Sequence, residues 1–189
     1  MDIKTDKRIY KSKAILKQSM IRILGNQSIS CVTISMLCKD AHINRNTFYR
    51  YYKVPGDVLD EILSEQMAVI IDDLNKTAPC QDYNSMLHVI CDYIYHNKEL
   101  STLLLSNKLG TNYLRSIIDK SNQNILSIFF EQTNIKRNKD VRLVNRYATG
   151  GTLLILQDWC LNGFRESPSV ITESLSSINT FLLDNYLFD

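Results

Sequence analysis

The sequence is poor in residues that interrupt helices, because its 189 positions hold only 6 glycines and 3 prolines. Such a chain favours long helices over many short strands and tight turns, and we expect an all-α fold. No run of about 18 apolar residues occurs, so we expect no membrane-spanning helix. The polar start MDIKTDKRIYKSK lacks the apolar core of a signal peptide, which predicts a cytoplasmic protein.

Metal and catalytic signatures are missing as well. The five cysteines form no C-x-x-C pair and no Cys/His ligand spacing; they are Cys31, Cys38, Cys80, Cys91 and Cys160. We therefore expect buried, reduced thiols, no metal site and no cofactor. The chain also lacks a G-x-S-x-G elbow, a phosphate-binding loop, an H-E-x-x-H helix and the Glu-x-x-His pairs of di-iron bundles, which argues against an enzyme.

The charge of the chain is unevenly distributed. Residues 1–60 hold eleven Lys and Arg against five Asp and Glu, a net +6, and the remainder carries −4 for a total of +2. A basic head on an acidic body suits a head that binds a polyanion. Hydrophobic residues make up 44% of the chain, which is enough for a folded core.

Apolar residues recur at helical spacing through most of the chain. A first helix is expected over residues 7–25. Two short helices are expected after Thr33 and Asn44, and a long one starts at Pro55 and reaches about residue 75. The other helices, for nine in total, are expected near residues 82–97, 99–108, 110–133, 139–163 and 168–187.

Residues 33–53, TISMLCKDAHINRNTFYRYYK, are predicted to form a two-helix unit. Thr33 and Asn44 are each flanked by apolar residues at the spacing of a hydrophobic staple, which predicts both as helix N-caps. His42 lies in the tight turn between the helices, where one residue must approach the left-handed region, so we interpret it as a turn residue. A small core against the first helix is expected from Leu37, Cys38, Ala41, Ile43, Phe48 and Tyr52.

The second short helix leaves long donors and aromatic side chains on its outer side. A helix of about two turns fits the major groove of DNA, which is about 12 Å wide. Arg45 suits guanine and Asn46 suits adenine, whereas Tyr49 is predicted to hold a phosphate. The outward residues are Arg45, Asn46, Thr47, Tyr49, Arg50 and Tyr51.

This stretch resembles the helix-turn-helix of the tetracycline-repressor (TetR) family. The family pattern is T-x-x-x-[IL]-A-x-x-A-G-[IV]-[ST]-x-x-T-[FL]-Y-x-[HY]-[FY]-x-[NS]-K-[ED]-x-L. Residues 33–52 align with it without a gap, and the matching residues are Thr33, Leu37, Ala41, Ile43, Thr47, Phe48, Tyr49, Tyr51 and Tyr52. Asn44, another helix-capping residue, stands at the [ST] position, and Asp57 and Leu59 lie one residue beyond the acidic and leucine positions. The resemblance covers about residues 7–63, and a later segment from Gly150 to Pro168 looks like one branch of the family. It implies a three-helix helix-turn-helix domain over residues 1–56 and a helical regulatory and dimerisation domain over residues 57–189.

Cys38, His42 and Pro55 are among the positions that depart from the family pattern. Pro55 stands where relatives often carry a lysine that holds a phosphate, so Lys53 or the Gly56 backbone is expected to replace that contact. The residues expected at DNA are Thr33, Asn44, Arg45, Asn46, Thr47, Tyr49, Arg50, Tyr51 and Lys53.

The last two expected helices are apolar nearly all round, which predicts that they are covered on more than one side. The family resemblance implies that they form a homodimer, and an ordinary core within one monomer is the alternative. The interface is expected to hold Leu153, Leu156, Cys160, Ile171, Leu175, Ile178 and Leu182. A dimer would supply two half-sites, whose contact free energies roughly add.

Members of the family usually bind a small molecule among the middle helices, so the resemblance implies a pocket for a small hydrophobic effector. Its candidate lining residues are Met67, Ile71, His88, Cys91, Tyr95, Tyr113, Ile117, Phe129 and Trp159. Side chains of these types at helical spacing also fit a plain core.

The sequence thus predicts a sequence-specific DNA-binding regulator, by default a repressor that binds a palindromic operator and is released by an effector. One alternative is a TetR-like regulator or activator controlled by a protein partner, with no small-molecule pocket. Another is a nonspecific nucleic-acid-binding protein, whose affinity would depend on salt but not on base sequence.

Overall fold

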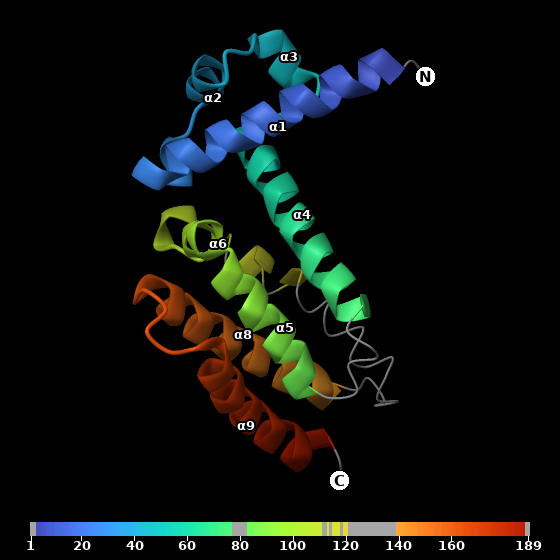
Figure 1. The fold of residues 1–189 in the computed structure, drawn as a ribbon, viewed down its shortest axis with the longest axis vertical. Helices are drawn as coiled ribbons and strands as arrows, with labels where there is room; N and C mark the ends of the chain where they lie inside the picture. Colours follow the sequence, from blue (N-terminus) through green and yellow to red (C-terminus); the bar gives the residue numbers. More distant parts are fainter. Residues whose placement is uncertain are drawn as a thin grey trace. The chain divides into compact units, whose positions relative to one another are not determined.

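The computed structural model describes residues 3–76, 83–110, 113, 115–117, 119–120 and 139–187. Within these ranges the chain is helical and contains no strand, which confirms the expected all-α fold (Figure 1). The elements are α1 (Ile3–Asn26), the 3-10 helix η1 (Ile29–Cys31), α2 (Ile34–Asp40), α3 (Arg45–Tyr49), α4 (Pro55–Lys76), α5 (Tyr83–His96), α6 (Lys98–Leu104), the 3-10 helix η2 (Asn107–Leu109), α8 (Lys139–Leu161) and α9 (Pro168–Leu187).

The observed helices follow the expected ones closely at most boundaries. α4 begins at Pro55 and α9 begins at Pro168. Both starts are as expected, because proline is favoured at the first position of a helix. The helix expected over residues 99–108 is divided into α6 and η2, because the chain turns at Leu105 and Ser106. Most of the helix expected over residues 110–133, including Phe129, lies outside the described residues.

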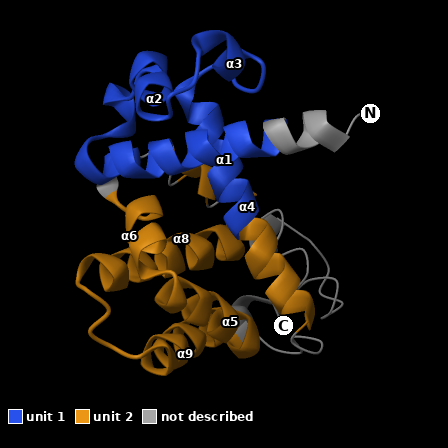
Figure 2. Cartoon of the chain, turned by 45° about the horizontal axis from the view of Figure 1, so that its top comes forward, with its two compact units in different colours: residues 1–66, 107–110 blue, residues 67–106, 111–189 orange. Residues whose placement is uncertain are grey.

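The chain divides into two compact units (Figure 2). Unit 1 comprises residues 1–66 and 107–110, and unit 2 comprises residues 67–106 and 111–189. The division falls inside α4, whose first half is joined to α1 by ion pairs of Lys13 and Lys17 with Glu61 and Glu65. The functional boundary expected after residue 56 stays a prediction.

Unit 1 is built on α1, and α2 and α3 lie along one side of this helix (Figure 1). Leu16, Met20 and Leu24 form the buried stripe of α1, each fully inaccessible to solvent. Leu37 of α2 and Phe48 of α3 are equally buried. The core expected for the two-helix unit is therefore confirmed, except that Ile43 is only half-buried.

In unit 2, α9 packs against both α5 and α8, and α6 packs against α5 and α8. α8 ends in a Schellman motif, in which Gly163 has φ +80° and the Phe164 N–H donates to Trp159 O at 2.9 Å. The hydrophobic contact that accompanies this motif joins Phe164 to Trp159, whose ring centroids lie 5.1 Å apart. Tyr95 stacks on Trp159, and the Lys98 ammonium lies 3.7 Å from the centre of the Tyr95 ring.

The cysteines within the described residues are all unbridged. Cys38, Cys91 and Cys160 are buried as expected, and burial raises the pKa of the Cys160 thiol to about 12. The expectation is wrong for Cys31, which is exposed because η1 buries none of its residues. Among these residues no group of His, Cys, Asp and Glu could hold a metal ion, and no helix is long and apolar enough to span a membrane.

Candidate nucleic-acid interface

The two short helices of unit 1 begin at the caps that the sequence predicts. Thr33 has an extended backbone, and its Oγ1 accepts a hydrogen bond from the Met36 N–H at 3.2 Å. Asn44 is also extended, and its Oδ1 accepts from the Asn46 N–H at 2.8 Å. Both side chains therefore cap the first turns of their helices, and these hydrogen bonds fix where α2 and α3 begin.

The turn between α2 and α3 is a second Schellman motif. His42 has φ +52°, its N–H donates to Lys39 O at 3.3 Å, and the Ile43 N–H donates to Cys38 O at 2.9 Å. The left-handed region is the one expected for a residue at this position of the turn. His42 is exposed, so its side chain has no buried role. The interpretation of His42 as a turn residue is confirmed.

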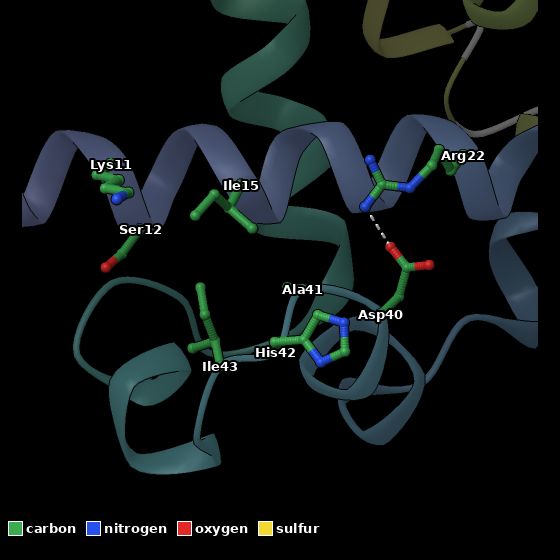
Figure 3. Close-up of a pocket in the computed structure, with 8 residues that line it drawn as sticks. All are labelled: Lys11, Ser12, Ile15, Arg22, Asp40, Ala41, His42 and Ile43. Atoms are coloured by element: carbon green, nitrogen blue, oxygen red, sulfur yellow. Dashed lines mark hydrogen bonds and ion pairs between the residues drawn. The ribbon is translucent and has the colours of Figure 1, made fainter.

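An open hollow of about 620 Å³ lies between α1 and this turn (Figure 3). Ile15 and Ile43 point toward one another across it. At one end, Arg22 Nη2 donates to Asp40 Oδ2 at 2.6 Å, and this bond lowers the pKa of the Asp40 carboxyl. The ion pair fastens the end of α2 to α1, so the turn has a fixed position on the first helix.

The outer side of α3 carries the side chains expected at DNA. Arg45, Asn46 and Arg50 are exposed, and Tyr49 is 58% exposed with its ring edge-on to the buried Phe48. Thr47 and Tyr51 are half-buried, so they offer less surface than the others.

The guanidinium of Arg45 donates a hydrogen bond to the hydroxyl of Ser35 on α2. Both residues are exposed, so this bond holds the side chain of Arg45 across the beginnings of α2 and α3. Ser35 is not among the residues that the sequence pattern predicts at this surface. Its position two residues after the Thr33 cap, at the start of a helix, is the signal that could have suggested it.

The start of α4 carries an acidic side chain on its free backbone donors. The Asp57 carboxylate accepts hydrogen bonds from the backbone N–H groups of Lys53, at 2.6 Å, and Val54, at 3.0 Å. A negative group thus occupies the positive end of the helix, where a phosphate would otherwise be favoured. The exposed Lys53 side chain is therefore a better candidate for a phosphate contact than this backbone.

Some of the positive charge counted in the first sixty residues is neutralised within unit 1. Lys13 pairs with Glu61 at 2.8 Å, and Lys17 pairs with both Glu61 and Glu65. The hydroxyl of Tyr52 also donates to Glu61. Because Glu61 and Glu65 lie just beyond residue 60, these contacts leave less positive charge for a polyanion than the net +6 of residues 1–60 implies.

The candidate effector residues lie in unit 2 with different degrees of burial. Cys91, Tyr113, Ile117 and Trp159 are buried, whereas Met67, Ile71 and Tyr95 are half-buried. His88 faces outward, with half of its side chain exposed and Nδ1 2.9 Å from Asp92 Oδ2. Phe129 lies outside the described residues.

The structure changes the set of residues that a second copy of the chain could contact. Leu156, Cys160, Ile171 and Leu175 are at most 8% exposed within a single chain, so they belong to its own core and supply no outer face. Leu153 and Leu182 are half-buried, and Ile178 is 52% exposed. Among the residues of α8 and α9 whose side chains the structure describes, the large exposed apolar ones are instead Leu143, Tyr147, Leu154, Ile155, Leu161, Val170, Ile178 and Phe181.

Two exposed stripes result from the spacing of these residues. Leu143, Tyr147 and Leu154 share one face of α8, and 49–67% of Val170, Ile178 and Phe181 is exposed along α9. The α8 stripe passes Gly150 and Gly151, where an added methyl group would meet nothing within 4 Å. Two glycines inside a helix cost about 1 kcal/mol each, and no close contact within the described chain explains them.

Comparison with known proteins identifies the class of the molecule. Residues 81–180, more than half of the chain, match the TetR_C_8 family, described as "Transcriptional regulator C-terminal region". The protein is thus a transcriptional regulator with a helix-turn-helix head. The chain belongs to the TetR family of transcriptional regulators. No curated protein matches the sequence.

Solved structures share the fold at low sequence identity. A TetR transcriptional regulator from Streptococcus agalactiae is 17% identical with a TM-score of 0.68, over 93% of this chain and 97% of that one. The fatty acid degradation regulator FadR from Bacillus halodurans is 14% identical with a TM-score of 0.65, over 89% and 94%. The dihydroxyacetone kinase operon activator DhaS is 13% identical with a TM-score of 0.59, over 93% and 98%.

Proposed function

We propose that this regulator binds a palindromic DNA operator as a homodimer, represses the adjoining genes, and is released by a small hydrophobic effector. The observation that carries the DNA-binding part is the exposed outer side of α3, on which Arg45, Asn46 and Tyr49 project from a helix fixed by its own cap. Arginine and asparagine are the side chains that read guanine and adenine through paired hydrogen bonds.

The Arg45–Ser35 hydrogen bond supports a base-reading role for Arg45. A side chain held in one geometry loses less conformational entropy when it binds than a freely rotating one. A guanidinium has five N–H donors, so Arg45 can keep its bond to Ser35 and still donate to a guanine. Lys53 and Arg50 extend the same surface with exposed positive charge.

The exposed stripes of α8 and α9 support the homodimer. Exposed apolar side chains along two helices that pack together favour cover by another surface, and the glycine pair would let a second backbone approach α8 closely. The interface that we propose is therefore made of Leu143, Tyr147, Leu154, Val170, Ile178 and Phe181, instead of the residues buried within one chain.

Control by an effector is supported by the burial of four of the candidate lining residues in unit 2, Cys91, Tyr113, Ile117 and Trp159. A relative of similar fold is a fatty acid degradation regulator.

The second candidate function is that of an activator, because another relative is described as the activator of an operon. Thermal unfolding with a panel of small hydrophobic compounds tests the effector: stabilisation by one compound, together with loss of DNA binding, supports the repressor.

Selection of bound sequences from a random DNA library tests the DNA-binding proposal. We expect an inverted repeat with half-sites about one helical turn apart. On that sequence, Arg45→Ala and Asn46→Ala should each lose about 1–3 kcal/mol of binding free energy, with little loss on random DNA. Enrichment of no sequence, or equal losses on both DNAs, would sink the base-reading assignment and favour nonspecific binding.

A further inference from the structure

Arg45 and Ser35 link the first turns of the two short helices of unit 1. Ser35 is the second residue of α2 and Arg45 is the first residue of α3, and Nη2 of Arg45 donates a hydrogen bond to the Ser35 hydroxyl. Both helices begin at capped residues, and the turn between them is held by its Schellman motif and by the ion pair of Asp40 with α1. The bond therefore joins two positions that the backbone already fixes.

The guanidinium of Arg45 lies over one side of α2. Cys38 follows Ser35 by three residues, so the two side chains share a face of that helix. Burial raises the pKa of the Cys38 thiol, and the positive charge of Arg45 opposes this rise. Arg45 thus contacts Ser35 and acts on Cys38, whereas an arginine extended into solvent would do neither.

The stability of unit 1 does not explain this placement of Arg45. The first turns of helices carry partial positive charge, so a cation at the starts of α2 and α3 is disfavoured. Among the described residues no carboxylate pairs with Arg45, and a hydrogen bond between exposed groups replaces bonds to water, so it adds little. A local arrangement that runs against stability is typical of a functional surface.

A guanidinium that is held reads a base more selectively than a mobile one. Two parallel N–H groups recognise O6 and N7 of guanine only when the guanidinium plane has one orientation. A mobile arginine can turn to a phosphate instead, and that contact carries no sequence information. Arg50, which is exposed at the end of α3, has no partner like Ser35 among the described residues and suits a phosphate contact.

We propose that Ser35 is a specificity-determining residue, which acts through Arg45 by holding its guanidinium in the orientation that reads guanine. Ser35 is a positioning residue in this role, and one base pair in each half-site depends on it. The inference rests on the proposed function, because it names a second residue of the same reading surface.

Binding to single-base variants of the selected operator tests this role. The position that Arg45 reads is the one at which Arg45→Ala loses discrimination. At that position Ser35→Ala should reduce the discrimination between guanine and the other bases about fivefold, the effect of one hydrogen bond, and should leave the other positions unchanged. Ser35→Thr keeps the hydroxyl and should retain the preference for guanine, and Ser35→Ala should add nothing to Arg45→Ala at this position.

The substitution itself should leave α2 intact, because Ser35 is exposed and alanine favours helices. The matched control is Ser30→Ala, which changes another exposed serine of unit 1, whose Oγ lies 3.1 Å from Ser28 Oγ. The control should bind every operator variant as the wild type does. A fault in folding would instead lower affinity evenly at all positions.

Nuclear magnetic resonance of the full chain without DNA tests the positioning separately. In the wild type the order parameter of the Arg45 Nε–H bond should exceed that of Arg50, because only Arg45 is held by a hydrogen bond. Ser35→Ala should bring the two order parameters together, and Ser35→Thr should keep them apart.

Three results would overturn the role of Ser35: full discrimination in Ser35→Ala, an even loss of affinity at all positions, or the same defect in Ser35→Thr. An Arg45 side chain as mobile as Arg50 in the wild type would overturn the positioning. A wild type that enriches no sequence overturns the proposed function and the specificity role together, and this failure is recognised before any substitution is made.

Discussion

The hydroxyl of Tyr52 donates a hydrogen bond to Oε2 of Glu61 at 3.0 Å, which joins the end of the two-helix unit to the first half of α4. The same carboxylate binds Lys13 on α1, so three segments of unit 1 meet at one half-buried group. Burial alone would raise the pKa of Glu61, but the hydrogen bonds from Lys13 and Tyr52 and the nearby lysine charges lower it. Burial and the charge of Glu61 raise the pKa of Tyr52, which therefore stays a donor.

Glu61→Gln should lower the free energy of unfolding by about 1–2 kcal/mol at pH 7, because the charged hydrogen bonds are lost. The pKa of Glu61 is lower in the folded chain than its ordinary value of 4.5, so its stabilisation is complete above that pH and is lost as pH falls through the lowered pKa. Urea unfolding at pH 7 and at about pH 3 should therefore show the difference between wild type and variant shrinking in acid.

The control for this experiment is Glu65→Gln. Glu65 pairs with Lys17 but is 49% exposed, so its loss should cost less than about 0.5 kcal/mol. An equal effect of the two substitutions, or a difference for Glu61→Gln that persists in acid, would contradict the special role of Glu61.

His42→Gly should raise the free energy of unfolding of unit 1 by roughly 0.5–1 kcal/mol. Relief of the left-handed backbone outweighs the greater entropy of glycine in the unfolded chain, and the exposed imidazole gives up little packing. His42→Val should act in the opposite direction, since a β-branched residue is disfavoured at this φ. Thermal unfolding of the two variants checks the prediction, and destabilisation by glycine would mean that the imidazole makes a contact worth more than the strain.

Helix caps and turns depend on residues that are close in the sequence, and these could be predicted. The face of a helix that its own chain covers depends on distant residues, and this could not be predicted. The caps at Thr33 and Asn44 and the left-handed His42 follow from local backbone chemistry, and the structure has all three. The outer faces of α8 and α9 were misassigned, because a helix that is apolar nearly all round does not reveal which side its own chain covers. Leu156 and Leu175 are buried, whereas Tyr147 and Phe181 are exposed.

The contacts of long polar side chains were equally hidden in the sequence. Gln157 reaches a carbonyl group 52 positions away, and Lys108 reaches one 83 positions away. Nothing in residue type or spacing distinguishes these two from solvated side chains. Ser35 was missed for the same reason, since its partner Arg45 lies on the next helix.

Tyr49→Phe should weaken DNA binding by about 0.5–1.5 kcal/mol on all sequences, the value of one lost hydrogen bond, without relaxing sequence preference. The edge-on contact with Phe48 would remain, because the ring is kept. Binding isotherms on the selected operator and on random DNA measure both effects. A changed base preference would show that Tyr49 reads a base, and unchanged affinity would show that its hydroxyl makes no contact.

Tyr147→Glu and Phe181→Glu should each convert a dimer into a monomer at micromolar concentration. Their side chains are 71% and 67% exposed in one chain, so a carboxylate there costs the protomer little but would be buried without a partner in the interface that we propose. The matched control is Tyr10→Glu, because Tyr10 is 76% exposed on α1 of unit 1. Sedimentation velocity should show dimers for the wild type and the control, and circular dichroism should show all three variants folded. A wild-type monomer, or folded dimers of both glutamate variants on α8 and α9, would remove the stripes from the interface, and the glycine pair in α8 would then need another explanation.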